Sequence, residues 1–250
     1  MATKITAHRG LPEKYPESTL VSFREAARAG ADRIELDAHL TADGQVVIHH
    51  DYNLGRIDDG KGLIFERDYA YLAALDVGSH FDLKYTGERM PLLREVFEEL
   101  GSEIEYELEL KDASPDLSSA VLGLVDEFGL LAQIEFTSPH HYVLPALREQ
   151  RPEIRTGKAV GPFPEWMPLA LGQRITKHNL LLGGINVVHC PVSNLTVDSV
   201  SDFHESGLGV HVDYCNTPTE LQMAFLFGVD GLTTDRLELA VDMRNAMSGK

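Results

Sequence analysis

Apolar positions along the chain alternate between a spacing typical of strands and a spacing typical of helices. Predicted strands cover Lys4–Ala7, the run from Arg33, Glu103–Lys111, Ala132–Thr137, Ile154–Val160, Gly184–His189, Gly209–Tyr214 and Gly231–Thr234. Predicted helices begin at Leu20 and cover Leu92–Leu100, Leu117–Phe128, His140–Gln150, Trp166–Asn179, Val197–Ser206, Pro218–Phe227 and Glu238–Met247. Repeated alternation of strand and helix predicts a parallel sheet with helical crossovers.

The number of strand–helix units, eight in a chain of 250 residues, matches a (β/α)8 TIM-type barrel of the α/β class. A doubly wound open sheet is the alternative, but the chain has no glycine-rich dinucleotide-binding turn. Residues 53–89 are rich in Gly, Asp and aromatic residues and show little sustained periodicity. We therefore predict a single barrel domain over residues 1–250, with a small insertion after the second strand at residues 53–89.

The stretch from Arg33 to Asp51 indicates a hairpin whose turn is Asp43-Gly44. On its first strand Glu35 and Asp37 lie on one face, opposite the apolar neighbours between and before them. Two acids on an otherwise apolar strand are costly to bury unless a cation or hydrogen bonds satisfy them. This pattern indicates a metal site with a histidine close by.

The strand Glu103–Lys111 alternates apolar residues with charged ones. If its apolar face packs against the helices, Glu109 and Lys111 point into the mouth of the barrel, and Glu109 meets Glu35 and Asp37. Three converging carboxylates repel one another without a cation, and oxygen ligands favour Ca²⁺ or Mg²⁺. Mn²⁺ is also compatible with these ligands.

The overall charge bears on the possible partners. The chain has 22 Lys and Arg against 39 Asp and Glu, a formal net charge of -17, which argues against nucleic acid as a partner. A small phosphorylated substrate stays compatible, because a bound cation reverses the local field. The N-terminus has no apolar run long enough for a signal peptide, no stretch approaches the length of a membrane span, and the two cysteines have no metal-type spacing. We expect a cytoplasmic protein without stable membrane association; a secreted form without its leader and a homo-oligomer both stay open.

Eleven histidines are present, and a lone histidine is more often structural than catalytic. We expect most of them at the surface or in loops, including His80, His140, His141, His178 and His204. A histidine near a hard cation, together with Arg and Lys, suits phosphoryl chemistry, because the cations stabilise charge on phosphate oxygens and imidazoles move protons.

Several motifs together resemble the glycerophosphodiester phosphodiesterase family. They are H-R-G (8–10), P-E-S-T (16–19), G-A-D-R-I-E-L-D (30–37), T-A-D-G (41–44), V-V-I-H-H-D (46–51), L-D-V-G (75–78), P-L-L-R-E-V (91–96), E-L-K (109–111) and G-V-D-G-L-T-T-D (228–235). The resemblance spans nearly the whole chain. It implies a TIM-type barrel enzyme that cleaves a glycerophosphodiester to glycerol 3-phosphate and an alcohol such as choline or ethanolamine.

The resemblance also implies residue roles. His8 and His50 match the two catalytic histidines, which act as general acid and base. Arg9 and Lys111 match positions expected to hold the phosphate. The implied metal ligands are Glu35, Asp37 and Glu109.

Three departures from the family pattern stand out. Ser18 replaces the usual Asn of P-E-N-T, and Glu107 stands where a neutral residue is common. Near the seventh strand the usual W-T-x-N becomes Asp213-Tyr214-Cys215-Asn216. We expect Asp213 and Asn216 to contact the substrate, with Asp213 replacing an apolar wall by a negative charge and so altering the choice of alcohol.

Two alternatives to this function are open. The changed wall at Asp213 also fits a lysophospholipase D-like or phospholipase C-like enzyme on lipid substrates, although the strongly negative charge argues against a membrane surface. A non-catalytic barrel that serves as a binding module is the second alternative, since a fold does not determine a function.

Overall fold

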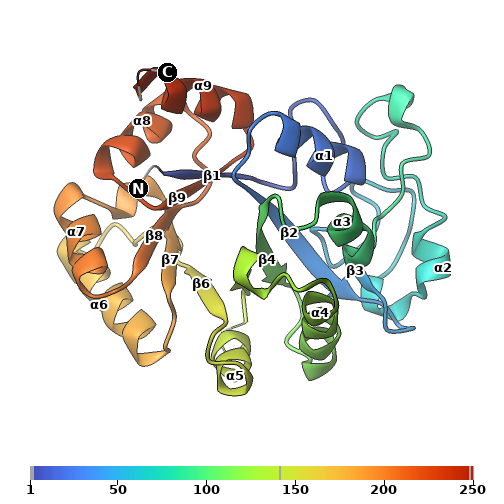
Figure 1. The fold of residues 1–250 in the computed structure, drawn as a ribbon, viewed down its shortest axis with the longest axis horizontal. Coiled ribbons are helices and arrows are strands. Elements are labelled where there is room, and N and C mark those ends of the chain that lie inside the picture. The colour runs from blue at the N-terminus through green and yellow to red at the C-terminus, as the bar shows by residue number, and fades with distance from the viewer. Residues whose placement is uncertain (1–2, 141, 248, 250) are drawn as a thin grey trace.

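The barrel strands of the computed structural model, which describes residues 3–140, 142–247 and 249, pair side by side in a closed ring (Figure 1). They are β1 (Lys4–Ala7), β2 (Arg33–Leu40), β4 (Glu105–Leu110), β5 (Ile134–Thr137), β6 (Arg155–Ala159), β7 (Val187–Cys190), β8 (Gly209–Val212) and β9 (Gly231–Thr234). All these neighbours are parallel, and β1 pairs with both β9 and β2, which closes the ring. The predicted TIM-type (β/α)8 barrel is confirmed.

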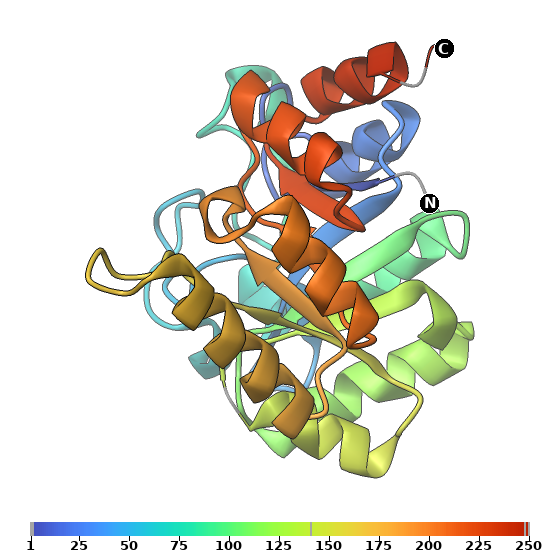
Figure 2. The same ribbon diagram turned by 90° about the vertical axis from the view of Figure 1, so that its left-hand side faces the viewer.

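Helices connect the strands and cover the outside of the barrel, as Figure 2 shows. They are α1 (Leu20–Arg28), α3 (Leu93–Leu100), α4 (Pro115–Phe128), α5 (Val143–Gln150), α6 (Leu169–Leu182), α7 (Val197–Glu205), α8 (Pro218–Phe227) and α9 (Leu237–Met247). The local sequence determines where several of these helices begin and end. Thr217 caps α8 by accepting the backbone N–H of Glu220, and Gly228 ends it in a left-handed conformation.

Several predicted boundaries are shifted. The helix predicted at Trp166–Asn179 begins at Leu169, because Pro168 is extended and caps the helix, and it continues to Leu182. The strand predicted at Ala132–Thr137 begins at Ile134, since the residues before it form a 3-10 turn. The strand predicted at Glu103–Lys111 is shorter at both ends.

The predicted hairpin is present, and irregular structure follows it. β3 (Val46–Ile48) pairs antiparallel with the carboxyl-terminal part of β2. Residues 53–89 then contain the 3-10 turns η1 (Ile64–Glu66) and η2 (Leu83–Tyr85) and the short helix α2 (Tyr69–Leu72). They share a small hydrophobic cluster with the hairpin, made of Val47, Leu54, Ile64, Leu72, Leu75, Val77 and Met90. This cluster holds the insertion beside the carboxyl end of β2.

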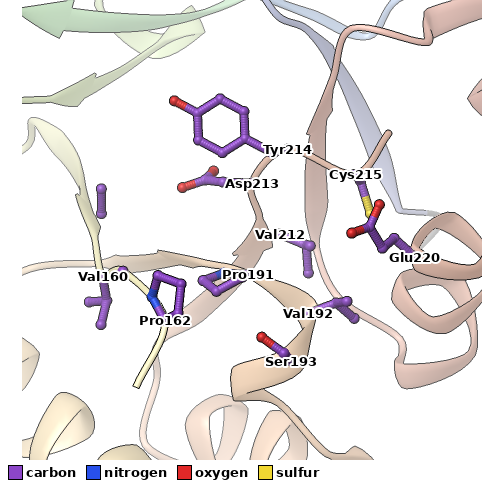
Figure 3. Close-up of a pocket in the computed structure, with 12 residues that line it drawn as sticks. Val160, Pro162, Pro191, Val192, Ser193, Val212, Asp213, Tyr214, Cys215 and Glu220 are labelled. Carbon is purple, nitrogen blue, oxygen red and sulfur yellow. The ribbon is translucent and has the colours of Figure 1, made fainter. Parts of the chain in front are cut away.

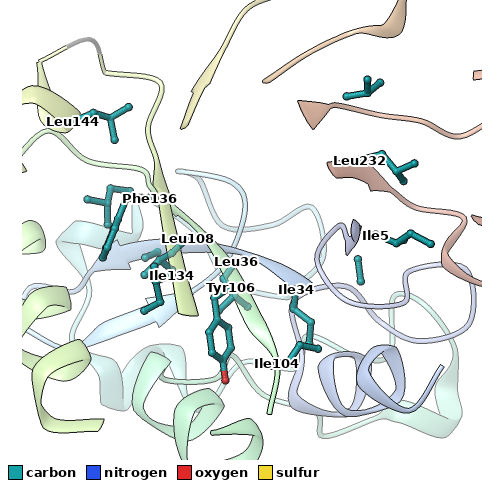
Figure 4. Close-up of a cluster of buried hydrophobic side chains, with 14 of the residues drawn as sticks. Ile5, Ile34, Leu36, Ile104, Tyr106, Leu108, Ile134, Phe136, Leu144 and Leu232 are labelled. Atoms are coloured by element: carbon teal, nitrogen blue, oxygen red, sulfur yellow. The ribbon is translucent and has the colours of Figure 1, made fainter. Parts of the chain in front are cut away.

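Both faces of β2 and β4 are buried, and the two faces differ in character. Ile34, Leu36, Tyr106 and Leu108 form part of the large hydrophobic core (Figure 4). The alternate residues of both strands are charged, and most of them are buried as well. Because side chains alternate along a strand, these charged residues point into the barrel, as the sequence predicts.

Histidines occur both at the surface and inside the barrel. His80, His178 and His204 are exposed and His140 is half-buried in a loop, as expected, while His141 lies outside the described residues. Four others are buried: His39, His49, His189 and His211. None of the helices in the described part of the chain combines the length and the hydropathy that a membrane span requires.

Candidate active site

The loop after β1 delivers His8 and Arg9 to the carboxyl rim of the barrel. Arg9 has a φ of 56°, in the left-handed region where side chains are strained. Gly10 has a φ of 94°, and a Cβ there would lie 2.3 Å from Oγ of Ser22 and 2.9 Å from its backbone carbonyl carbon. The H-R-G motif therefore needs glycine, because the loop turns directly against α1.

Five charged residues at this rim form what we call the mouth cluster: Arg9, Glu35, Asp37, Glu109 and Lys111. The register of β2 and β4 places Asp37 beside Glu109. Nζ of Lys111 lies 2.7 Å from Oδ1 of Asp37 and 2.5 Å from Oε1 of Glu109, so it bridges the two strands. Oε2 of Glu35 accepts a hydrogen bond of 3.1 Å from the backbone N–H of Arg9.

The mouth cluster has more negative charge than its cations satisfy. Burial and the charges of Asp37 and Glu109 raise the pKa of Glu35 well above its usual value. Oδ2 of Asp37 is buried and has no hydrogen-bond partner among the described residues; Nε of Arg9 lies 3.6 Å away. A buried carboxylate oxygen without a donor, beside further carboxylates, fits the oxygen-ligand chemistry of a divalent cation.

His8 is held by a carboxylate from the opposite end of the chain. Its Nδ1 lies 2.7 Å from Oδ1 of Asp235, which follows β9. Because a carboxylate only accepts, Nδ1 carries the proton and Nε2 is left for another partner. Nδ2 of Asn216 donates to Oδ2 of Asp235 over 2.6 Å, and the side-chain Oδ1 of Asn216 accepts a hydrogen bond from the backbone N–H of Asp235. Asn216 therefore holds Asp235, and Asp235 holds His8.

His50 is held in the same way from the hairpin side. Its Nδ1 lies 2.7 Å from Oδ1 of Asp51, so Nε2 is again left for another partner. Nε of Arg56, in the insertion, donates to Oδ2 of Asp51. Burial lowers the pKa of His50, and Lys111 and Arg9 add to this, while Asp37 and Asp51 oppose it. A neutral imidazole at neutral pH suits proton transfer.

Two cavities flank these residues at the rim. One, of about 520 Å³, is lined by His50, Asp51, Arg56, Glu109 and Lys111 among others. The other, of about 290 Å³, lies at the carboxyl ends of β6, β7 and β8 (Figure 3). Its walls are formed mainly by Val160, Pro162, Pro191, Val192, Val212, Asp213 and Tyr214.

Tyr214 connects the second cavity to His8. The rings of Tyr214 and His8 meet edge to face with centroids 5.2 Å apart. Burial and the charge of Asp213 raise the pKa of the Tyr214 phenol. Glu35 adds to this rise, while Arg9 opposes it. Asp213 itself lies in the cavity wall, with Oδ1 3.2 Å from Nδ1 of His189. The second cavity therefore lies close to His8, with the Tyr214 ring between them.

A second group of charged residues, here called the interior cluster, lies inside the barrel: Arg33, Glu107, Glu135, His189 and His211. Nε2 of His189 lies 2.6 Å from Oε1 of Glu135, and its Nδ1 lies 3.3 Å from Oε1 of Glu107. Nη1 of Arg33 lies 3.3 Å from Nδ1 of His211. Burial works to lower the pKa of His189, but Glu107 and Asp213 outweigh it and raise that pKa well above its usual value.

The interior cluster contains a possible metal site. Ligand atoms of Glu107, His189 and His211 lie within 4.8 Å of one another, and all three side chains are buried. In the described part of the chain, the carboxylates of Glu35, Asp37 and Glu109 are not gathered as closely, and Nζ of Lys111 lies between Asp37 and Glu109. The two sets of ligands are thus distinct in geometry.

The predicted site residues fall into three places. The structure brings most of them to one rim: His8, Arg9, Glu35, Asp37, His50, Glu109 and Lys111. Asp213 lies in the adjoining cavity, and Asn216 contacts Asp235 and Thr234.

Other residues of the site were not among those predicted. Asp51 and Asp235 end two of the quoted motifs, H-H-D and T-T-D, so their position after a histidine or a strand is a usable signal. Arg56 lies in the aperiodic insertion and gives no such signal. Glu135 gives none either. His189 and His211 lie at or near the carboxyl ends of predicted strands, which is a signal, but their partners are decided by contacts across the barrel.

A closed parallel barrel with its ionisable residues gathered at the carboxyl ends of the strands is the arrangement of a TIM-barrel enzyme. Residues 8–239 match the model of the glycerophosphoryl diester phosphodiesterase family, and the chain belongs to this family.

Relatives and solved structures agree with this assignment. The chain is 27% identical to a glycerophosphodiester phosphodiesterase of Caldanaerobacter subterraneus over 97% of its own length and 98% of the relative's. It is 28% identical to one of Bacillus altitudinis, over 98% of this chain and 99% of that one. An Oleispira antarctica phosphodiesterase, solved in complex with the product sn-glycerol-3-phosphate, superimposes with a TM-score of 0.82 at 28% identity, covering 96% of this chain and 97% of that one.

Proposed function

We propose that this chain hydrolyses glycerophosphodiesters to glycerol 3-phosphate and an alcohol, with His8 and His50 as general acid and base. The observation that carries the proposal is that both imidazoles are hydrogen-bonded to an aspartate in the same way. Each is held through Nδ1 by a carboxylate, at 2.7 Å in both cases, with the mouth cluster beside them. Membership of the family and the product bound to the Oleispira antarctica relative support the same reaction.

Each histidine has one nitrogen available for proton transfer. With Nδ1–H donated to Asp235 or Asp51, Nε2 is the atom that exchanges a proton with the substrate. One histidine takes a proton from the nucleophile, either water or a substrate hydroxyl, and the other gives a proton to the oxygen of the leaving alcohol. The carboxylates keep both rings in the orientation that this exchange needs.

The cations of the mouth cluster would bind the phosphate. Nε of Arg9 is buried and has no hydrogen-bond acceptor among the described residues, so a phosphate oxygen would satisfy it. Lys111 adds a second buried positive charge, with a pKa raised above its usual value because the charges of Asp37 and Glu109 outweigh the effect of burial. Both groups stabilise the charge that develops on the phosphoryl oxygens.

Glu35, Asp37 and Glu109 would hold a divalent cation, Mg²⁺ or Ca²⁺. The unpartnered Oδ2 of Asp37 and the raised pKa of Glu35 support this, because both are relieved by a nearby positive charge. When bound, the cation would neutralise part of the charge on the phosphate.

A lysophospholipid is a second candidate substrate. Trp166 is 74% exposed in the segment after β6, whose first residues, 160–162, line the cavity next to Tyr214. A mainly apolar cavity at the rim, with an exposed aromatic side chain on the segment that leaves it, fits a lipid chain. Comparing the turnover of soluble glycerophosphodiesters with that of lysophospholipids separates the two substrates.

The test of the proposed function is hydrolysis of glycerophosphocholine by protein freed of metal with a chelator, before and after addition of Mg²⁺ or Ca²⁺. We expect release of glycerol 3-phosphate that depends on the added metal. His8→Asn and His50→Asn should each lower kcat by roughly 10²–10⁴-fold, the usual contribution of a general acid or base.

His204→Asn is the matched control. His204 also pairs with a carboxylate, at 2.8 Å from Asp230, but this pair lies before β9, at the amino ends of the strands. We expect its activity to equal that of the wild type. Unchanged turnover in both His8→Asn and His50→Asn would show that the assigned roles are wrong.

A further inference from the structure

A chain of alternating charges runs from Arg9 to His50 through the insertion. Nη1 of Arg9 donates to Oε1 of Glu17 over 3.1 Å. The same carboxylate accepts two hydrogen bonds from Arg56, of 2.6 Å from Nη2 and 3.1 Å from Nη1. Nε of Arg56 donates to Asp51, whose other oxygen holds Nδ1 of His50. One guanidinium therefore joins the supports of a phosphate-binding residue and of a catalytic histidine.

The residues of this network come from two parts of the chain, the loop between β1 and α1 and the segment after the hairpin. Arg9 follows β1, Glu17 precedes α1, and Arg56 belongs to the irregular segment that starts at residue 53. The side chains of Glu17 and Asp51 are only 18% and 24% exposed, whereas that of Arg56 is 45% exposed. Arg56 thus closes the network from the solvent side, and its fork-shaped guanidinium can bind two carboxylates at once.

Charges along the network reinforce one another. Burial works to raise the pKa of Glu17, but hydrogen bonds and charges from Arg56 and Arg9 hold it below its usual value. The pKa of Asp51 is also held below its usual value, because Arg56 and His50 outweigh the effect of burial. Both carboxylates therefore stay ionised and keep accepting hydrogen bonds from their partners.

The support of His8 differs in one respect. Asp235 is held by the neutral amide of Asn216, on the same side of the barrel. Asp51 is held by a guanidinium from the insertion, which reaches back to the loop carrying Arg9. Among the described residues, only the second arrangement couples a histidine to a phosphate-binding residue through hydrogen bonds.

We propose that Arg56 is a positioning residue, which orients His50 through Asp51 and Arg9 through Glu17. The inference rests on the proposed function, since it concerns the same reaction. Arg56 touches neither reacting group directly; it restricts the rotation of Asp51 and Glu17, and these restrict the imidazole and the guanidinium that act on the phosphodiester.

A purely structural role is the competing explanation. Arg56 would then only fasten the insertion to the barrel, and its loss would lower stability without a specific effect on turnover. The two roles separate in kcat and KM, because a structural fastening does not select between binding and the chemical step.

The experiment compares Arg56→Met and Arg56→Lys with the wild type on glycerophosphocholine, with urea unfolding measured alongside. We expect Arg56→Met to lower kcat by roughly 10- to 100-fold, as for other residues that orient catalytic side chains. Lys keeps the charge but lacks the planar fork of donors that holds Glu17 through two hydrogen bonds and Asp51 through a third, so Arg56→Lys should restore only part of the loss.

Glu17→Gln tests the other arm of the network. It weakens the hold on Arg9 and leaves the contact between Arg56 and Asp51 in place. We therefore expect a rise in KM that exceeds the fall in kcat. This variant also keeps the inference testable if Arg56→Met fails to fold.

Arg94→Met is the matched control. Arg94 is 41% exposed and makes a two-pronged pair with Glu127, yet it lies on α3, outside the site. We expect wild-type kcat and KM from it. The inference is overturned if Arg56→Met keeps the wild-type kcat, or if it loses stability with no more effect on kcat than Arg94→Met. A wild type that hydrolyses no glycerophosphodiester would instead overturn the proposed function itself.

Discussion

The mouth cluster and the interior cluster share strands β2 and β4 but differ in how their charges are satisfied. Glu109 belongs to the first and Glu107 to the second, two residues apart on one face of β4. Inside the barrel, both nitrogens of His189 face carboxylates at 2.6–3.3 Å. At the mouth, Oδ2 of Asp37 and Nε of Arg9 lack hydrogen-bond partners among the described residues.

Backbone strain is distributed in the same uneven way. The described non-glycine residues with positive φ are Arg9, Ser18 and Tyr214, and each lies in a loop that contributes to the mouth. The interior cluster stands on regular strands. Backbone strain therefore collects at the mouth, whereas unpartnered buried atoms occur in both clusters, since Nε of Arg33 also has no hydrogen-bond partner among the described residues. We therefore expect the two clusters to respond differently to mutation.

The largest expected effect is the loss of stability of His189→Gln. The substitution removes the positively charged partner of the buried carboxylates Glu135 and Glu107. Leaving a buried charge without its partner lowers the free energy of unfolding by about 3–5 kcal/mol. Urea unfolding measures this change. His204→Gln, which removes an exposed pair, should cost less than about 1 kcal/mol. Equal losses in the two variants would contradict the distinction between the clusters.

Lys111→Met should reduce activity more than stability. It removes the cation that bridges Asp37 and Glu109 and contacts the proposed phosphate site. We expect kcat/KM on glycerophosphocholine to fall by at least about 100-fold, as when a group that stabilises transition-state charge is removed. Lys177→Met, which breaks a surface pair with Asp202, is the control and should keep full activity. If the Lys111→Met protein keeps the wild-type kcat/KM, the mouth cluster does not take part in catalysis as proposed.

The interior cluster should also make stability depend on pH. The pKa of His189 is raised in the folded state, so above about pH 6.5 the folded protein keeps a proton that the unfolded chain has lost. Stability is then fully present below that pH and is lost as pH rises towards the folded pKa. Between pH 7 and 9 the free energy of unfolding should fall by up to about 1.4 kcal/mol per pH unit. Urea unfolding at several pH values measures this slope. If the slope stays the same in His189→Gln, His189 is not the cause of the pH dependence.

Ser18→Asn should give the smallest effect. Ser18 has a φ of 56° and a buried Oγ without a partner in the described structure, while its N–H donates to the carbonyl of Arg9. Asn tolerates the left-handed region better than Ser, so relief of strain should raise the free energy of unfolding by about 0.5–1 kcal/mol. Thermal unfolding measures this gain. A lower melting temperature would show that the mouth has no space for the larger side chain.

Local patterns in the sequence predict the fold well, because each strand–helix unit carries its own periodicity. Helix boundaries differ from the prediction where a single residue determines the first turn. Pro168, for example, occupies the N-cap position, so α6 begins at Leu169. The carboxylates Glu35, Asp37 and Glu109 are also predictable, since alternation along two strands places them on one face. The register of β2 and β4 places Asp37 beside Glu109, as the strand pattern implies, and places Glu35 beside Glu107.

Contacts between distant parts of the chain are not predictable in this way. The pair of His8 and Asp235 spans 227 positions, and the contacts of Arg56 depend on how an aperiodic insertion folds back. The interior cluster is another such case. Glu135, His189 and His211 come from three strands, and only closure of the barrel brings them together.

In the proposed mechanism the divalent cation acts at the mouth cluster rather than at the interior cluster. The most direct test is calorimetric titration of Mg²⁺ and Ca²⁺ into Glu109→Gln and Glu107→Gln, with hydrolysis measured on the same samples and folding checked by circular dichroism. The substitutions are identical and lie two residues apart on β4. We predict that Glu109→Gln loses both metal binding and hydrolysis while Glu107→Gln keeps both; the reverse result would contradict the claim.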